Sequence, residues 1–467
     1  MKILLISPAS GKWRQIGKGG IFNGRYFRFS MLSLLTVAAL SPKDADVKIV
    51  DEQLEDIPQN EDFDIVGITV MTATAPRAYG ISRHFRERGI PVVLGGFHPS
   101  LNTNEALSNA DAIVVGPAFG AWQKLLEDLK KGHLEKIYYG DIKGQIPAGL
   151  PRHLIETKGY VTVNAAYATM GCANKCRFCS ISRFYGAGHY KRNLDNVIKE
   201  VASFEERFFI FVDDNLTQDR DFAAELLRRL KPLKKKWITQ ASVDLADNDE
   251  MLRLLRDAGC IGLFIGLESF NEKALYGQEK TVNVPQRYQS AIKKFHSFGI
   301  FVESGVIFGF DNDDISVFGT TLRMLEKIGI DAIQVSILTP LPGTNLYEDY
   351  RDRIIDTNWQ HYDYRHVVFE PRQLSPEHLQ AGTDWVIRKF YSPLRILRRL
   401  FRWLFVPQGM KNLIYPLGLN IAYFGRVWRF SICGYNPELK RDWMPRDREV
   451  FGKNAALFEK VGFVAKA

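Results

Sequence analysis

Short apolar, β-rich runs alternate with amphipathic segments twice along this chain. The first series lies within residues 1–140 and comprises KILLIS, VKIVDE, DIVGITV, PVVLGG and AIVVG. Most of these runs are apolar throughout, as expected for parallel strands that helices cover on both faces. The amphipathic segments at 75–88 and 119–131 predict helices between them. We therefore expect an α/β domain with an open, doubly wound parallel sheet.

The second series begins near residue 160 and predicts a barrel-like sheet. Its apolar runs are YVTVNAAYA, FFIFVDD, WITQASVD, IGLFIGLES, FVESGVIFGF and AIQVSILTP. Helical patterns separate them at 193–206, 219–231, 248–258, 272–298 and 314–328. Six βα units fall short of the eight that close a barrel, so we expect a partial (β/α)6 barrel that is open on one side.

The alternation also indicates where the domains end, because 467 residues are too many for one core. A Gly- and Pro-rich stretch, GDIKGQIPAGLPR, separates the two series and predicts a linker at 141–155. We expect domains at 1–140 and 156–345, followed by a mainly helical region at 346–467.

Three of the five cysteines lie in GCANKCRFCSI, directly after a predicted strand. Cys172, Cys176 and Cys179 can converge on one centre from a single loop, which predicts metal ligation in a reducing compartment. A structural zinc ion usually takes four ligands, and His189 is the nearby candidate for the fourth. A four-iron cluster held by three cysteines would instead leave one iron open to a substrate.

The motif C-x-x-x-C-x-aromatic-C after the first strand of a partial barrel resembles that of the radical S-adenosylmethionine (SAM) superfamily. The resemblance implies a [4Fe-4S] cluster on Cys172, Cys176 and Cys179, with SAM bound at the open iron and cleaved to a 5′-deoxyadenosyl radical. Carboxyl ends of barrel strands form the sites of such folds. The SAM-binding residues that the resemblance implies are Phe178, Asp213, Asn215, Gln240, Ser242, Gly266, Glu268 and Ile307. For Asp213 the alternative is a helix cap.

The first domain resembles the cobalamin-binding, Rossmann-like domain of class B radical SAM methyltransferases, through VGITVMTATAPRA, PVVLGGFHPS, EALSNADAIVVG and AWQKLLEDL. It has no G-x-G-x-x-G after its first strand, which disfavours ordinary dinucleotide binding. It also lacks D-x-H-x-x-G, so we expect His98 to contact the nucleotide tail or cap a loop rather than bind cobalt. The alternative is a domain that keeps the fold without the cofactor. The implied cobalamin-binding residues are Thr69, Thr72, Gly95, Gly96, His98, Ser100 and Gly116.

The segment from Trp385 to Pro437 contains nine basic residues, twelve aromatic residues and no Asp or Glu. The net charge of the whole chain is +9, so this segment accounts for all of it. Basic and aromatic residues at helical spacing suit an anionic membrane surface. A packed helical tail that happens to be basic is the alternative, and nucleic acid comes third because the aromatic residues lie beside Leu and Ile.

Two further observations concern localisation. No stretch reaches the about 18 apolar residues of a membrane span. The N-terminal run MKILLISPAS is too short for a signal peptide and predicts a first strand instead. We therefore expect a cytoplasmic protein that contacts the inner face of the membrane through 385–437.

These features predict a cobalamin-dependent radical SAM methyltransferase that acts on an unactivated carbon. ILTPLPGTNLYED and NWQHYDYRHVVFEPRQLSPEHL resemble the tail of members acting on hopanoids and other lipids, which implies a small-molecule or lipid substrate. An electron donor such as flavodoxin or ferredoxin is also implied. Tyr362, Tyr364 and His366 either line the substrate space or pack the tail on the barrel. The alternatives are a radical SAM enzyme that couples, cyclises or rearranges its substrate, and a zinc-stabilised nucleic-acid-binding module.

Overall fold

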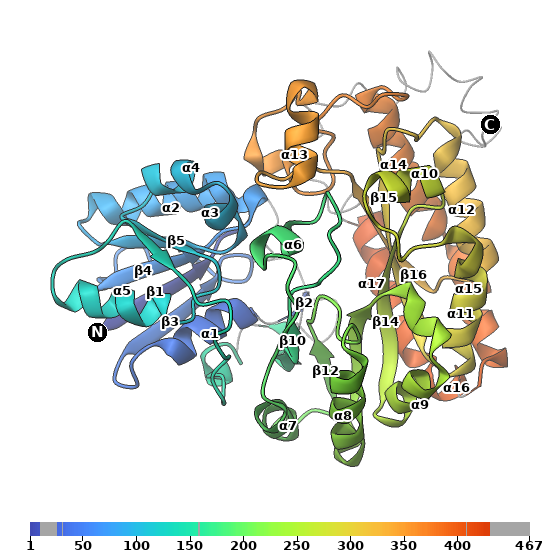
Figure 1. The fold of residues 1–467 in the computed structure, drawn as a ribbon, viewed down its shortest axis with the longest axis horizontal. Helices are drawn as coiled ribbons and strands as arrows, with labels where there is room; N and C mark the ends of the chain where they lie inside the picture. Colours follow the sequence, from blue (N-terminus) through green and yellow to red (C-terminus); the bar gives the residue numbers. More distant parts are fainter. Residues whose placement is uncertain (10–25, 30, 157–158, 408, 430–467) are drawn as a thin grey trace.

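Two parallel sheets of six strands each organise the chain (Figure 1). The structure is a computed structural model, and it describes residues 1–9, 26–29, 31–156, 159–407 and 409–429. A parallel strand pair requires a crossover connection, and helices form most of these crossovers in both sheets. The first sheet lies in the blue part of Figure 1, and the second lies in the green and yellow part.

Helices cover both faces of the first sheet. Its strands are β1 (Lys2–Ser7), β3 (Asp46–Asp51), β4 (Ile65–Thr69), β5 (Val92–Gly95), β6 (Ala112–Val115) and β7 (Ile137–Tyr139), in the order β3-β1-β4-β5-β6-β7. Its helices are α1 (Leu32–Leu40), α2 (Ala75–Glu87), α3 (Phe97–Leu101), α4 (Thr103–Ser108) and α5 (Ala121–Lys130). Leu5 packs with α1 and α5, whereas its neighbour Leu4 packs with α2 and α4. This burial on both faces confirms the predicted doubly wound sheet.

The second sheet is the predicted partial barrel. Its strands are β9 (Ala165–Ala166), β12 (Phe208–Phe211), β13 (Lys236–Ala241), β14 (Cys260–Glu268), β15 (Phe301–Phe308) and β16 (Ala332–Ile337), in the order β16-β15-β14-β13-β12-β9. Among the described strands, β9 and β16 do not pair, so the barrel is open as expected. The helices of this domain are α7 (Leu194–Ala202), α8 (Arg220–Leu230), α9 (Asp249–Asp257), α10 (Glu272–Gly277), α11 (Tyr288–Ser297) and α12 (Ser316–Ile328).

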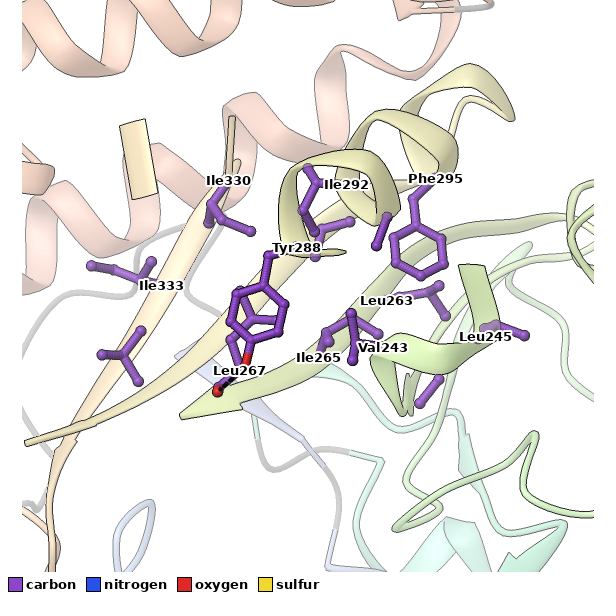
Figure 2. Packing of buried hydrophobic residues seen from close by; sticks show 14 of the residues in the cluster. Val243, Leu245, Leu263, Ile265, Leu267, Tyr288, Ile292, Phe295, Ile330 and Ile333 are labelled. Atoms are coloured by element: carbon purple, nitrogen blue, oxygen red, sulfur yellow. Dashed lines mark hydrogen bonds between the residues drawn. The ribbon is translucent and has the colours of Figure 1, made fainter. Parts of the chain in front are cut away.

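Helix α11 packs on β14 and β15 through large buried side chains (Figure 2). Tyr288 and Phe295 of α11 belong to the same hydrophobic core as Leu263 and Leu267 of β14. Each such side chain contributes about 1.5–3 kcal/mol when fully buried. The Tyr288 hydroxyl also donates a hydrogen bond to the carbonyl oxygen of Leu267 at 3.0 Å. It thereby fixes the end of β14, where the polar side chains of the site begin.

Two predicted elements are interrupted in the structure. The run predicted as one strand at 160–168 is divided: β8 (Tyr160–Thr162) pairs with β2 (Tyr26–Phe29) outside the barrel, and only β9 joins it. The Thr162 hydroxyl turns the chain between them by accepting a hydrogen bond from the Asn164 N–H. The helix predicted over 272–298 breaks between α10 and α11, because Glu279 adopts a left-handed φ of 56° and ends the first helix.

The described part of residues 346–467 is mainly helical. It contains α14 (Pro376–Phe390), α15 (Pro393–Arg402), α16 (Gly409–Asn412) and α17 (Ile414–Arg429), preceded by α13 (Asn345–Tyr350). Residues 430–437 of the basic segment lie outside the described residues. No helix in the described ranges has the length and hydropathy that crossing a bilayer requires.

Candidate active site

A short hairpin carries the three cysteines past the carboxyl end of β9. Its arms are β10 (Thr169–Met170) and β11 (Tyr190–Lys191), and the cysteine loop leads into α6 (Ser180–Phe184). Gly171 begins the loop with φ = 80°, and a Cβ there would lie 2.4 Å from the carbonyl oxygen of Gly188. Only glycine fits this position, because a side chain would meet backbone and strain φ as well.

Two carboxylates after β12 anchor the chain just before the first cysteine. Asp213 is fully buried and accepts hydrogen bonds from the N–H of Ala168 at 3.1 Å and the hydroxyl of Thr169 at 2.7 Å. Asp214 accepts from the N–H of Gly171 at 2.9 Å. Burial raises the pKa of Asp213 to about 7 and that of Asp214 to about 6. Asp213, predicted to bind SAM, thus has its carboxylate engaged by the hairpin.

The thiols themselves lie in a poorly solvated place. Burial raises the pKa of Cys176 to about 11 and also raises that of Cys179. Among the described residues, no three His, Cys, Asp or Glu side chains are placed as ligands of one metal ion, and His189 bonds to the backbone of Asn215 instead. A four-iron cluster takes each thiolate on a different iron atom, so separated cysteines fit it better than they fit zinc.

Lys280 is the cation beside the thiols, and sequence reasoning missed it. Its Nζ lies 3.5 Å from Oε1 of Glu268, and both side chains are largely buried. Burial by itself lowers the pKa of Lys280, but Glu268 and the three cysteines outweigh burial and raise it. The ammonium therefore stays charged. The signal that could have found Lys280 is the helix break before Pro285, which places it in a loop at the mouth of the barrel.

Glu268 has a backbone conformation that is uncommon for a residue with a side chain. Its φ is 63°, and the register between β14 and β15 shifts between Gly266 and Glu268. Such a conformation costs about 1–3 kcal/mol and is concentrated at functional sites. A Cβ on Gly266 would lie 2.3 Å from Oε1 of Glu268. The glycine therefore makes room for the carboxylate to turn toward Lys280.

Other predicted SAM-binding residues gather at the neighbouring strand ends. Asn215 Nδ2 donates a hydrogen bond to Ser242 Oγ at 2.9 Å. The Oδ1 of Asn215 is buried and has no hydrogen-bond partner in the described part of the chain. The side chain of Gln240 is half-buried at the end of β13, and Phe178 and Ile307 are half-buried against the barrel core. The structure thus brings Asn215 and Ser242 into contact and leaves a polar atom there to bind a ligand.

A cavity of about 330 Å³ opens at the carboxyl edge of the first sheet, where ligands of open α/β sheets bind. On the barrel side it is lined by Tyr167, Met170 and Tyr185, which flank the cysteine loop in sequence. The lining is largely apolar, and glycines let a large ring approach the strand ends closely, so the cavity suits one face of a corrin ring. The predicted cobalamin-binding residues in this lining are Thr69, Gly95, Gly96 and Gly116.

The remaining predicted cobalamin-binding residues lie behind or beside this cavity. Ser100 donates to the carbonyl oxygen of Gly96 at 2.7 Å and accepts from the N–H of Gly116 at 2.9 Å, so it ties two glycine turns together. His98 is fully buried, and its Nδ1 lies 3.3 Å from the hydroxyl of Thr72. In the structure His98 does not reach the cavity.

A second cavity, of about 290 Å³, lies next to the first, and Met71, Thr74 and Phe97 line both. It continues between the first domain and the C-terminal region, and it reaches Ser180, the residue after the third cysteine. Tyr364 lines it with a left-handed φ of 66° and is hydrogen-bonded to Ser180. Of the three tail residues whose place was left open, Tyr362 and Tyr364 line the cavity, whereas His366 is buried against Asp363.

Two family models match the two sheet-containing parts of the chain described above. The model described as "Radical SAM superfamily" matches residues 167–325, and the model described as "B12 binding domain" matches residues 32–126. The first range covers most of the partial barrel, and the second covers most of the first sheet.

Individual relatives extend over most of the chain. Bacteriochlorophyllide d C-12(1)-methyltransferase of Chlorobaculum tepidum is 30% identical over 414 residues, which cover 85% of this chain and 89% of that protein. Hopanoid C-2 methylase of Rhodopseudomonas palustris is 25% identical, with coverage of 85% and 82%. The structure of the cobalamin-dependent S-adenosylmethionine radical enzyme OxsB, with aqua-cobalamin and S-adenosylmethionine bound, has a TM-score of 0.62 at 13% identity and covers 100% of this chain and 82% of its own. That similarity establishes a shared fold.

Proposed function

The chain belongs to the radical SAM superfamily, in the branch with an N-terminal B12-binding domain, and we propose that it methylates an unactivated carbon. It is an enzyme whose cofactors are a [4Fe-4S] cluster, SAM and cobalamin. The observation that carries the proposal is the pair of neighbouring cavities between the two domains. The first lies at the strand ends of the B12-binding domain, the second reaches the residue after Cys179, and Met71, Thr74 and Phe97 line both.

The residues of the barrel mouth divide the work of holding the cluster and SAM. Cys172, Cys176 and Cys179 would bind the cluster. Lys280 would hold the carboxylate of SAM and Glu268 its amino group, since opposite charges pair best where both are desolvated. The amide and hydroxyl groups of Asn215, Gln240 and Ser242 would bind the ribose, while Phe178, Gly266 and Ile307 would contact the adenine side. Asp213 would act indirectly, by fixing the hairpin.

The edge of the first sheet would hold cobalamin. Thr69, Gly95, Gly96 and Gly116 would contact it, and Ser100, His98 and Thr72 would support those contacts from behind. When bound, the cluster and SAM supply a radical that removes a hydrogen atom from the substrate, and cobalamin supplies the methyl group. The protein aligns the two and excludes water with Tyr167, Met170 and Tyr185.

The second cavity would bind the substrate. Its lining combines apolar and aromatic side chains, among them Phe97, Leu341 and Tyr364, with polar and charged ones, among them Asp363 and Arg365. A ligand with an apolar body and a few polar groups suits such a pocket. The names of the two relatives given above refer to a bacteriochlorophyllide and a hopanoid, both polycyclic compounds with large hydrophobic ring systems. We therefore propose a hydrophobic small-molecule or lipid substrate. Flavodoxin or ferredoxin would supply the electron, in a cytoplasmic enzyme that meets the membrane through 385–437.

Product analysis tests the proposal. The anaerobically purified holoenzyme would be given SAM, a reductant and either bacteriochlorophyllide d or a hopanoid. If the enzyme transfers a methyl group, the methylated product, S-adenosylhomocysteine and 5′-deoxyadenosine should form in equal amounts. Deoxyadenosine with an altered but unmethylated product would favour the coupling, cyclising or rearranging alternative.

A matched pair of cysteine variants tests the cluster. Cys176→Ala should lose most iron and sulfide together with all turnover of SAM. Cys260→Ala should keep the iron, because that thiol is buried in the core of β14, where its Sγ lies 3.5 Å from the carbonyl oxygen of Gly262. Zinc without sulfide in the parent protein would contradict the radical mechanism altogether.

A further inference from the structure

Helix α15 exposes a row of apolar side chains to solvent. A surface helix normally turns its apolar residues toward the core and its charges toward solvent. In α15 and the turn that follows it, Arg399 and Trp403 face inward and are buried. The side chains on the opposite face are leucines and phenylalanines that contact solvent. This arrangement leaves a strongly apolar surface without a partner among the described residues.

The inward residues hold the helix firmly. The guanidinium of Arg399 donates to the carbonyl oxygen of Phe390 and to Oδ1 of Asn420, each at 2.8 Å. It also lies 3.9 Å from the centre of the Phe390 ring. The indole N–H of Trp403 donates to Oδ1 of Asp331 at 2.7 Å. Because buried polar groups lose these bonds if the helix rotates, the outward face is fixed by the fold.

The outward face forms an apolar stripe, defined here as Leu394, Leu397, Phe401, Leu404 and Phe405. Leu397, Phe401 and Phe405 are 64%, 62% and 76% exposed. The spacing of three and four residues places the stripe along one side of the helix. Single exposed apolar residues are common on soluble proteins, but a contiguous patch of this kind marks a binding surface.

The charges around the stripe indicate what it binds. Arg398 lies on α15 itself, and Lys411 lies on α16, which packs against the turn Trp403–Phe405. Both are exposed, and neither forms an ion pair within the described ranges. Arg395, on the same flank, is paired with Glu326. The surrounding segment has no carboxylate from Trp385 to Pro437. A second copy of this chain is disfavoured, because two basic surfaces would repel each other. Nucleic acid is disfavoured because exposed leucines do not contribute to binding it.

We propose that the apolar stripe inserts into the interface of an anionic membrane, with Arg398 and Lys411 beside the lipid phosphates. Apolar side chains below the headgroups and cations level with them are the arrangement of interfacial helices. Each cation near an anionic leaflet strengthens binding by about 1 kcal/mol, which is about a fivefold change in affinity. This inference rests on the membrane contact proposed above and not on the methyl transfer, so vesicle binding and product analysis can fail separately.

Vesicle sedimentation with the full chain tests the stripe. The vesicles would be phosphatidylcholine with about one third phosphatidylglycerol, compared with phosphatidylcholine alone. The double variant Phe401→Ser, Phe405→Ser should bind the anionic vesicles at least about tenfold more weakly than the parent. Tyr139→Ser is the matched control, because Tyr139 is 73% exposed but lies on β7 of the first domain. It should bind like the parent.

Charge reversal separates the electrostatic part. Arg398→Glu should weaken binding to anionic vesicles by about fivefold or more and leave binding to neutral vesicles unchanged. Arg253→Glu is the control, because Arg253 is an exposed residue of α9 in the barrel domain. It should change binding to neither kind of vesicle. Equal binding of parent and double variant would overturn the proposal. The proposal would also be overturned if the parent were a dimer and the double variant a monomer with unchanged vesicle binding. A cross-link between α15 and residues 430–467 that persists on vesicles would overturn it as well.

Discussion

At the scale of single residues, conformational strain and paired charge meet at Glu268. A left-handed φ in a β-strand residue is maintained only when the surroundings compensate for it. Here the Tyr288 hydroxyl holds the preceding carbonyl, Gly266 leaves space, and Lys280 attracts the carboxylate. The strained backbone at Glu268 thus fixes its carboxylate and the ammonium of Lys280 beside the cysteines.

Replacing Glu268 separates its strain from its function. Glu268→Gly should be more stable than Glu268→Ala by about 1 kcal/mol, because glycine accepts positive φ and alanine does not. Both variants should lose SAM binding, since both lack the carboxylate. Urea unfolding would measure the first effect and equilibrium dialysis with SAM the second. An alanine variant as stable as the glycine variant would show that φ at this position carries no strain.

Lys280 offers a second test at the same scale. Lys280→Met removes the charge and keeps the length, so SAM affinity should fall by about tenfold or more, while Lys280→Arg should retain part of it. Iron and sulfide content, measured alongside, distinguishes loss of SAM binding from loss of the cluster. If Lys280→Met bound SAM as well as the parent does, the ammonium would have no role in holding the reagent.

At the scale of elements, the β10–β11 hairpin positions the cysteine loop. Its entry depends on Gly171, where an added Cβ would collide with Gly188 and Tyr185. Gly171→Ala should cost about 1–3 kcal/mol and reduce iron incorporation in anaerobic reconstitution. Gly186→Ala is the matched control, since it also has positive φ, 62°, but no atom within 4 Å of an added Cβ. It should retain iron, and a similar loss in both variants would point to general loop strain instead.

At the scale of the whole molecule, a partly buried hydrogen-bonded contact joins the B12-binding domain to the C-terminal region. The indole N–H of Trp359 donates to both carboxylate oxygens of Glu105, at 2.9 Å each, across 254 positions of sequence. Phe97 of α3 also packs on Phe184 of α6, with ring centres 4.5 Å apart. Phe97 and Phe184 line the first cavity, and Trp359 packs on Tyr362, which lines the second. The two contacts therefore help to fix the positions of the parts of the chain that surround the cavities.

This contact predicts a pH dependence of stability. Burial acts to raise the pKa of Glu105, but hydrogen bonds from His98, Trp359 and Tyr79 outweigh it and lower the pKa to about 2. A lowered pKa stabilises the fold above the unfolded value near 4.5, and that stabilisation is lost as the pH falls toward 2. Glu105→Gln should therefore be less stable than the parent at pH 7. The loss should be only about 1 kcal/mol, because solvent weakens the interactions of a partly exposed carboxylate.

Urea unfolding of the cofactor-free protein from pH 7 to pH 3 measures this effect. The difference between parent and Glu105→Gln should shrink continuously below pH 4.5. Glu250→Gln, at an exposed site on α9, should follow the parent at every pH. A difference that stayed constant down to pH 3 would show that Glu105 is not the titrating group.

The two series of strands and helices and the cysteine motif can be predicted from sequence alone, because the patterns that indicate them are local. Strand and helix periodicity is local, and three cysteines within eight residues must share one loop. The breaks at 160–168 and 272–298 were missed because side-chain turns and a left-handed residue ended elements whose apolar pattern continued. The same local pattern placed Asn215, Gln240, Ser242 and Glu268 at strand ends correctly.

Only the tertiary structure decided which distant groups meet. The Lys280–Glu268 pair, the Glu105–Trp359 contact and the anchoring of Thr169 by Asp213 all join separate elements. The sequence of α15 indicated an amphipathic basic helix, but not that Arg399 turns inward and Phe401 outward. Whether a side chain is buried depends on the residues that pack against it. The fold of the whole chain determines those contacts, and the neighbouring residues in the sequence do not.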